Sequence, residues 1–353
     1  MRAKLALVAA FLASSEPVGA HEANPSRYTY SEHVRPIFLR HCGGCHRAEG
    51  IAPMSLLDYQ EAVPWANAIK MQLLQQTMPP WLPADGIGAF RHERSLTAEE
   101  IDIVIDWAVG QTPRGELPAD FELERDAPAA IEPQLWLDSG TEVVLAEDEF
   151  EKTACVALPT NLAGSRLATT FIVQPGLPTI VRRATIFRGS ACEGRAPLAT
   201  WLPDQRSVSY PEGSGILLAA GESLALEIVY VKGWTDDGKR LTDRTRLGIT
   251  FAAEVEPIQS VCIETHSYEL TDGSSLVALY PDLSGAEEPF RVDAVLPDGS
   301  SERLLFIERY EPAWREKYVL ETPLRLPAGS RLEISQPTLW ADFLSTTGAG
   351  SEQ

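Results

Sequence analysis

The feature that most constrains the fold of this chain is a change of hydrophobic pattern near residue 111. Residues 28–110 carry apolar side chains at helical spacing, whereas the chain from Leu135 onward runs in short β-type segments such as 170–173 and 224–230. Between them, residues 111–134 hold four prolines among many acidic residues, a composition typical of a linker. The sequence therefore predicts a multidomain α + β protein, with an all-α N-terminal domain followed by β-sandwiches.

Two helices of the N-terminal part are marked by their ends. Asp58 with Glu61 predicts the start of a helix that continues through Trp65, Ile69, Leu73 and Leu74 at three-to-four spacing, and Met71 within this apolar pattern is expected in the core. Pro64 is expected to break or kink this helix early.

The closing helix has clearer signals. Thr97 and Glu100 form a capping box, and Gly110 is a plausible stop. The apolar residues between them recur at helical spacing, which predicts one buried face.

The charge of the chain limits its partners. It carries 30 Lys and Arg against 50 Asp and Glu, a formal charge of −20 with a pI of about 4.7. Such a surface repels phosphate backbones, so nucleic-acid binding is disfavoured, as is binding to an anionic membrane. A protein partner with a basic docking face is the electrostatic complement.

Residues 1–20 have the three parts of a secretory signal peptide. Arg2 and Lys4 precede an apolar stretch over 5–13, and small residues over 18–20 mark a cleavage site. No apolar stretch is long enough to span a bilayer, so no transmembrane segment is expected after signal removal. The protein is therefore expected in the periplasm or outside the cell, where disulfide bonds form.

The strongest chemical signal is the sequence Cys42-Gly43-Gly44-Cys45-His46. This is C-x-x-C-H, the attachment motif of c-type haem. The two thiols would form thioethers with the porphyrin, and His46 would be the proximal iron ligand. A thioredoxin-like pair lacks its βαβ setting here, a zinc site lacks two further nearby ligands, and a Cys42–Cys45 disulfide leaves the histidine unexplained. One covalent haem c is therefore expected.

The second axial ligand is expected to be Met78. It precedes Pro79-Pro80-Trp81, a stiff, extended segment that can carry a thioether over the open face of the ring. Met–His ligation raises the reduction potential and suits electron transfer. Met54 and His92 are the alternatives, along with a solvent molecule. His33 and His41 are expected at the surface or the haem edge, and Trp65 and Trp81 are candidate ring-packing residues.

Residues 28–110 resemble the class I cytochrome c fold, which assigns residues 21–110 to a cytochrome c domain. More narrowly, the segments from Cys45 to Leu57, Met78 to Trp81 and Arg94 to Thr97 resemble a bacterial group. In that group the cytochrome is fused to a region similar to copper type II, ascorbate-dependent monooxygenases, such as peptidylglycine hydroxylating monooxygenase. The resemblance implies two tandem jelly-roll β-sandwiches, here over 135–256 and 257–353.

Several β segments carry this second resemblance. They are residues 153–159, 176–187, 226–230, 242–248 and 278–285. The resemblance pairs Cys155 with Cys192 in a disulfide of the first sandwich. It leaves Cys262 unpaired, as a small buried residue or a reactive thiol.

The copper ligands of that family are missing. Its two sites need five histidines and one methionine, but residues 93–353 hold one histidine, His266, and no methionine. The matching positions hold other residues: Arg182, Arg183, Val229, Tyr280 and Asp282. Guanidinium groups have no lone pair to give and would repel a cation, so copper is not expected and monooxygenase activity is expected to be lost. Because neighbours on a strand point to opposite faces, at most one of the two arginines should face the core.

The sequence thus predicts a secreted monohaem c-type cytochrome that transfers single electrons. Its degenerate monooxygenase-like β region would act as a scaffold or partner-binding module. The alternative is a subunit or variant of a haem-fused copper monooxygenase-like oxidoreductase, and a catalytically active copper relative is then a candidate partner.

Overall fold

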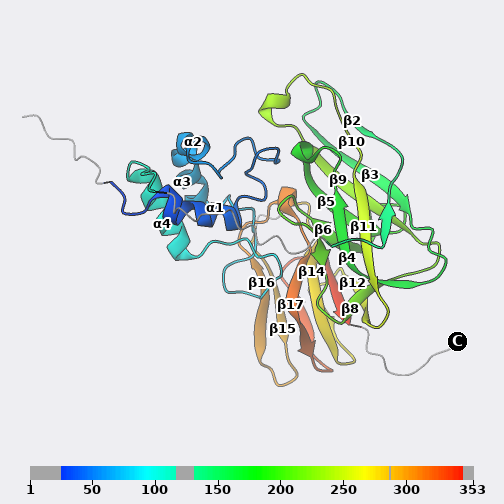
Figure 1. The fold of residues 1–353 in the computed structure, drawn as a ribbon. Coiled ribbons are helices and arrows are strands. Elements are labelled where there is room, and N and C mark those ends of the chain that lie inside the picture. The colour runs from blue at the N-terminus through cyan, green and yellow to red at the C-terminus, as the bar shows by residue number, and fades with distance from the viewer. Residues whose placement is uncertain (1–24, 117–130, 286–287, 345–353) are drawn as a thin grey trace, which may run out of the picture.

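The protein is an α + β chain in which the helices precede several β-sheets, as the sequence predicts. The computed structural model describes residues 25–116, 131–285 and 288–344. The helical region lies to one side of the β region, and the segment between α3 and α4 runs along the β strands (Figure 1). The expected signal peptide and the acidic linker residues 120–126 lie outside the described residues. No helix in the described part is long and apolar enough to cross a membrane.

The helical region is built around three aromatic side chains. Tyr30, Phe38 and Trp107 are fully buried, and their ring centroids lie 6.0 to 6.3 Å apart. Such tilted and edge-to-face contacts favour one arrangement of the helices. The helical elements are a π-helical turn at Tyr30–Val34, α1 at Arg35–His41, α2 at Tyr59–Ala62, a 3₁₀ turn at Val63–Trp65, α3 at Ala66–Leu74 and α4 at Ala98–Val109.

The helix ends follow the sequence signals, but one prediction for a residue within a helix is wrong. Asp58 accepts a hydrogen bond from the Gln60 amide at 2.8 Å, and the 3₁₀ turn at Pro64 divides α2 from α3. The Thr97–Glu100 capping box and the stop at Gly110 are also confirmed. The prediction for Met71 is wrong, because its side chain is 41% exposed. It lies two residues from both Ile69 and Leu73, which places it on the opposite face of α3.

In the β region one nine-stranded sheet runs through two halves, and each half packs against its own four-stranded sheet to form a pair of layers; the described residues also include a separate two-stranded sheet. The strands are β1 Leu135–Leu137, β2 Val143–Leu145, β3 Glu151–Pro159, β4 Arg166–Gln174, β5 Val181–Arg188, β6 Pro197–Trp201, β7 Val208–Ser209, β8 Ser214–Leu218, β9 Ser223–Val231, β10 Leu241–Asp243, β11 Arg246–Ala252, β12 Glu256–Ile263, β13 Ser267–Glu269, β14 Ser274–Pro281, β15 Phe290–Val295, β16 Ser301–Ile307, β17 Tyr318–Leu326, β18 Arg331–Ile334 and β19 Leu339–Leu344.

Each pair of sheets encloses its own core. The four-stranded sheet β3-β9-β5-β6 shares one buried apolar cluster with β1, β11, β4 and β8. The sheet β13-β18-β15-β16 shares a second cluster with β12, β19, β14 and β17. Short parallel pairing between β8 and β12 joins the two halves into one nine-stranded sheet. The buried Lys317 also joins them, because its Nζ donates to the Pro197 carbonyl at 2.5 Å and pairs with Asp342.

The segment between α3 and α4 packs into the β region. Pro83 forms a β-bridge with Ile307, and Phe90 forms one with Leu320. The Arg91 amide also donates to the Val319 carbonyl at 2.8 Å. Phe90 is 2% exposed and belongs to the second β core. The part of the chain that carries Met78 at its start is therefore anchored on β16 and β17.

The predicted disulfide is confirmed. Cys155 on β3 and Cys192 after β5 are bonded, with a sequence separation of 37 residues. Cys262 on β12 is not disulfide-bonded and is half-buried.

Removing this disulfide should destabilise the first pair of sheets. Loop-closure entropy for a separation of this size gives at most about 4 kcal/mol. We expect the double variant Cys155→Ser with Cys192→Ser to lose about 2 to 4 kcal/mol of unfolding free energy in urea denaturation. Cys262→Ser, which leaves the bridge intact, is the matched control. Equal stability of the double variant and the control would contradict this assignment.

Candidate haem attachment site

The two motif cysteines and the motif histidine lie in one tight turn at the end of α1. Cys42 caps the helix, and its amide donates to the Phe38 carbonyl at 2.9 Å. The Cys42 carbonyl then accepts from the amides of Cys45 at 3.1 Å and His46 at 2.8 Å. Both thiols are free, and burial raises the pKa of each to about 12, which keeps them protonated. The turn therefore presents two unpaired sulfurs beside one imidazole.

The imidazole of His46 is oriented by the backbone. Its Nδ1 lies 3.2 Å from the Met54 carbonyl oxygen, which can only accept a hydrogen bond. The proton is therefore on Nδ1, and Nε2 keeps its lone pair. Burial also lowers the pKa of His46, which keeps the ring neutral. A neutral imidazole with its other nitrogen fixed in this way is how proteins present histidine to a metal. The donor set fits a covalently attached haem.

The glycines of the motif allow the β region to approach the turn. A Cβ added to Gly44 would lie 2.4 Å from the Cβ of Asp204, in the loop between β6 and β7. Any larger residue at position 44 would force this loop away from the turn. The helical region and the first pair of sheets therefore meet directly at the attachment turn.

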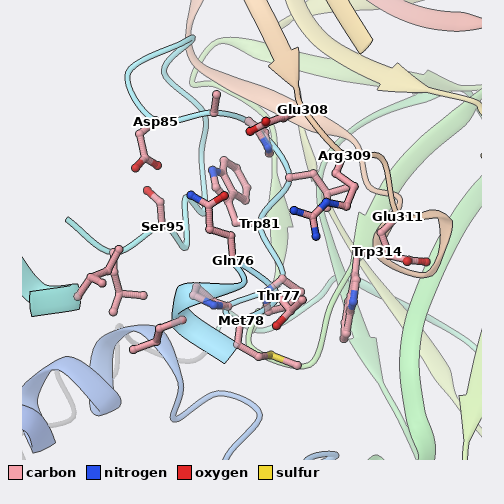
Figure 2. Close-up of a pocket in the computed structure, with 18 residues that line it drawn as sticks. Gln76, Thr77, Met78, Trp81, Asp85, Ser95, Glu308, Arg309, Glu311 and Trp314 are labelled. Atoms are coloured by element: carbon pink, nitrogen blue, oxygen red, sulfur yellow. The ribbon is translucent and has the colours of Figure 1, made fainter. Parts of the chain in front are cut away.

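Met78 lies on a cavity between the two regions. The cavity has a volume of about 390 Å³ and is lined by residues that include Met78, Trp81 and Trp314. Figure 2 shows Met78 at the lower edge of this cavity, with its sulfur directed away from Trp81. Cys42, Cys45 and His46 are not among the lining residues.

The alternative axial ligands have other surroundings. The side chain of Met54 lines a second cavity of about 560 Å³, together with Trp65 of the helical region and Asp236 of the β region. The His92 side chain is exposed; desolvation lowers its pKa, and Asp204 acts on it in the opposite direction. The structure thus brings the backbone of Met54 to His46 and places the side chains of Met54 and Met78 on separate cavities.

The remaining histidines of the helical region have polar partners of their own. His41 Nε2 lies 3.3 Å from Glu100, and Nδ1 of His33 accepts from the Thr29 amide at 3.1 Å. Trp81, a candidate for packing on the ring, packs against Phe90 and Tyr318, with ring centroids 6.3 and 5.7 Å away.

A buried charge cluster lies beside the attachment turn. Arg94 is 5% exposed, and its Nη2 donates to Glu316 and, at 3.2 Å, to the Pro80 carbonyl. Its Nη1 lies 3.6 Å from Asp204. The sequence marks Arg94 only as part of the motif from Arg94 to Thr97 and predicts neither carboxylate partner. Glu316 is 222 residues away, so no local spacing could have revealed the pair.

The positions of the missing copper ligands hold other interactions. Arg183 is buried, pairs with Glu227 at 3.1 Å and donates to the Pro312 carbonyl, while Arg182 is half-buried and pairs with Glu151. Only one of the two arginines is buried, as the alternation of a strand predicts. Tyr280 is buried, and Asp282 pairs with Arg315 at 2.8 Å.

The single histidine of the β region is also engaged. Nδ1 of His266 lies 3.0 Å from the Ile334 carbonyl. Among the described residues, no three His, Cys, Asp or Glu side chains are grouped so that they could hold a metal ion.

Comparisons with known proteins give no family. No protein-family model and no curated protein sequence matches this chain. Among solved structures, the major capsid protein P2 of bacteriophage PM2 is similar at 10% identity over 61% of this chain and 99% of that chain, with a TM-score of 0.26. An oxalate decarboxylase is similar at 8% identity over 67% of this chain and 86% of that chain, with a TM-score of 0.16.

The buried Glu316 should make stability depend on pH. Burial raises its pKa to about 7 against the attraction of Arg94, so the folded state binds a proton that the unfolded state releases near pH 4.5. The unfolding free energy should therefore fall as the pH rises from about 5 to about 7, by at most about 3 kcal/mol. Glu316→Gln should remove this part of the slope in urea denaturation series. An identical slope in wild type and variant would refute it.

Proposed function

We propose that the protein is a secreted or periplasmic monohaem c-type cytochrome that transfers single electrons. The observation that carries this proposal is the attachment turn: two free thiols, Cys42 and Cys45, beside His46, whose Nδ1 is bound to the Met54 carbonyl. This arrangement leaves Nε2 available to a metal, and the thiols have the spacing that haem attachment requires.

Haem c would supply a one-electron iron couple. Cys42 and Cys45 would hold the ring, and His46 and Met78 would hold the iron. The Met54 carbonyl keeps the proton on Nδ1 of His46, so Nε2 would keep its lone pair for the iron.

In this proposal residues 21–110 form a class I cytochrome c domain. The two pairs of sheets are then tandem jelly-roll sandwiches of the monooxygenase type, over 135–256 and 257–353. The shared cores of the paired sheets and the Cys155–Cys192 disulfide support that assignment.

The β region would serve as a scaffold or partner-binding module without copper. Arg183 occupies an expected ligand position and is fixed by Glu227, so a cation there would meet a buried positive charge. A redox partner with a basic face suits the formal charge of −20. A copper-containing relative is a second candidate partner.

A haem and metal inventory of the mature protein tests this function. We expect one iron per chain, held as haem that stays with the protein after denaturation, and no stoichiometric copper. Cys42→Ala with Cys45→Ala should lose the covalent haem, whereas Cys262→Ser should keep it. One or two copper ions per chain would instead favour the haem-fused copper oxidoreductase.

The axial ligand can be tested separately. Met78→Ala should lower the reduction potential and abolish the low-spin Met–His spectrum of the ferric protein, because the thioether favours the reduced iron. Met54→Ala and His92→Ala are the matched controls and should keep that spectrum. An unchanged spectrum in Met78→Ala would show that another group is the ligand.

A further inference from the structure

The segment that follows Met78 is fixed by one side chain. Arg94 Nη2 donates to the Pro80 carbonyl at 3.2 Å, and the guanidinium lies over Trp81 with its carbon 5.1 Å from the ring centroid. These contacts hold the two residues that come directly after Met78 and Pro79. Arg94 is thus the one described side chain that binds both the backbone and the ring of this segment.

Arg94 is in turn fixed by the β region. Glu316, between the 3₁₀ turn Pro312–Trp314 and β17, accepts a hydrogen bond from Nη2 and has a side chain only 4% exposed. Asp204 lies 3.6 Å from Nη1, and its own backbone presses against Gly44 of the attachment turn. The guanidinium therefore links the Met78 segment, the attachment turn and two separate parts of the β region.

We propose that Arg94, clamped by Glu316 and Asp204, is a positioning residue that holds the Met78 thioether in place as an axial ligand, so that the β region controls the ligation of the haem. This inference rests on the proposed function. A buried guanidinium suits the role because its planar fork can bind a carbonyl and two carboxylates at once, which a lysine ammonium on a flexible stem cannot do with the same geometry.

The clamp requires a negatively charged side chain at Glu316. Above about pH 7, where the Glu316 carboxylate is ionised, a neutral residue of the same shape would remove the charge that balances buried Arg94 and would free the guanidinium to leave the Pro80 carbonyl. The Met78 segment would then open more often, and an added ligand would reach the sixth position more easily. The β region would influence the iron without touching it.

The experiment compares wild type with Glu316→Gln, Asp204→Asn and Arg94→Lys as full-length, haem-loaded proteins, at a pH above about 7 so that the wild-type Glu316 is ionised. The readouts are the Met–iron charge-transfer band of the ferric protein and the binding of imidazole. Loss of one charge-assisted hydrogen bond predicts imidazole binding at least roughly tenfold tighter in Glu316→Gln and Arg94→Lys, with a weakened band. Asp204→Asn should move both readouts the same way but less, since its carboxylate is farther from the guanidinium and partly exposed.

Two controls separate the clamp from general damage. Glu308→Gln and Arg309→Gln each remove an exposed charge on the same cavity and should leave both readouts at wild-type values. Circular dichroism would confirm that each variant is folded; if Glu316→Gln does not fold, Asp204→Asn still decides. Wild-type imidazole binding in all three clamp variants would overturn the inference while the haem and its attachment stand. A wild-type protein without covalent haem would instead overturn the proposed function.

Discussion

The burial of one positive charge organises the meeting of the two regions. Arg94 is almost inaccessible to water, so its charge must be balanced locally, and the balance comes from Glu316 and Asp204 of the β region. Separation of the helical region from the β region would leave the Arg94 charge without Glu316 and Asp204, the carboxylates that balance it. The backbone contacts of residues 83–91 with β16 and β17 lie along the same boundary between the helical region and the β region. The candidate site is therefore built on a fixed junction between the two regions.

The attachment turn illustrates how small residues create this junction. Gly43 and Gly44 let the turn close at the end of α1, and the absence of a side chain at Gly44 lets Asp204 come close. The same turn leaves His46 facing the Met54 carbonyl. Each feature of the turn thus has a local cause, and residues 42–46 together carry two free thiols and one oriented imidazole.

Local features were predictable from the sequence, and long-range ones were not. The helix caps at Asp58, Thr97 and Gly110 depend on hydrogen bonds to residues within one turn of the chain, so the local sequence is enough to predict them. The Cys155–Cys192 disulfide was predicted only through the resemblance to a known family. Met71 was misplaced because an apolar residue within a helix was assigned to the core without regard to its face. The ion pair between Arg94 and Glu316 could not be predicted, because a pairing across 222 residues leaves no pattern in either segment of the sequence.

The central claim is that Cys42 and Cys45 carry a haem, and peptide mapping of the purified mature protein tests it most directly. The account predicts that the proteolytic fragment containing residues 42–46 has the mass of its chain plus one haem, with neither thiol available to an alkylating reagent. The Cys155 and Cys192 fragments should be recovered joined, and Cys262 should be alkylated. Recovery of the 42–46 fragment with two alkylated cysteines, from a host that matures other c-type cytochromes, would contradict the account.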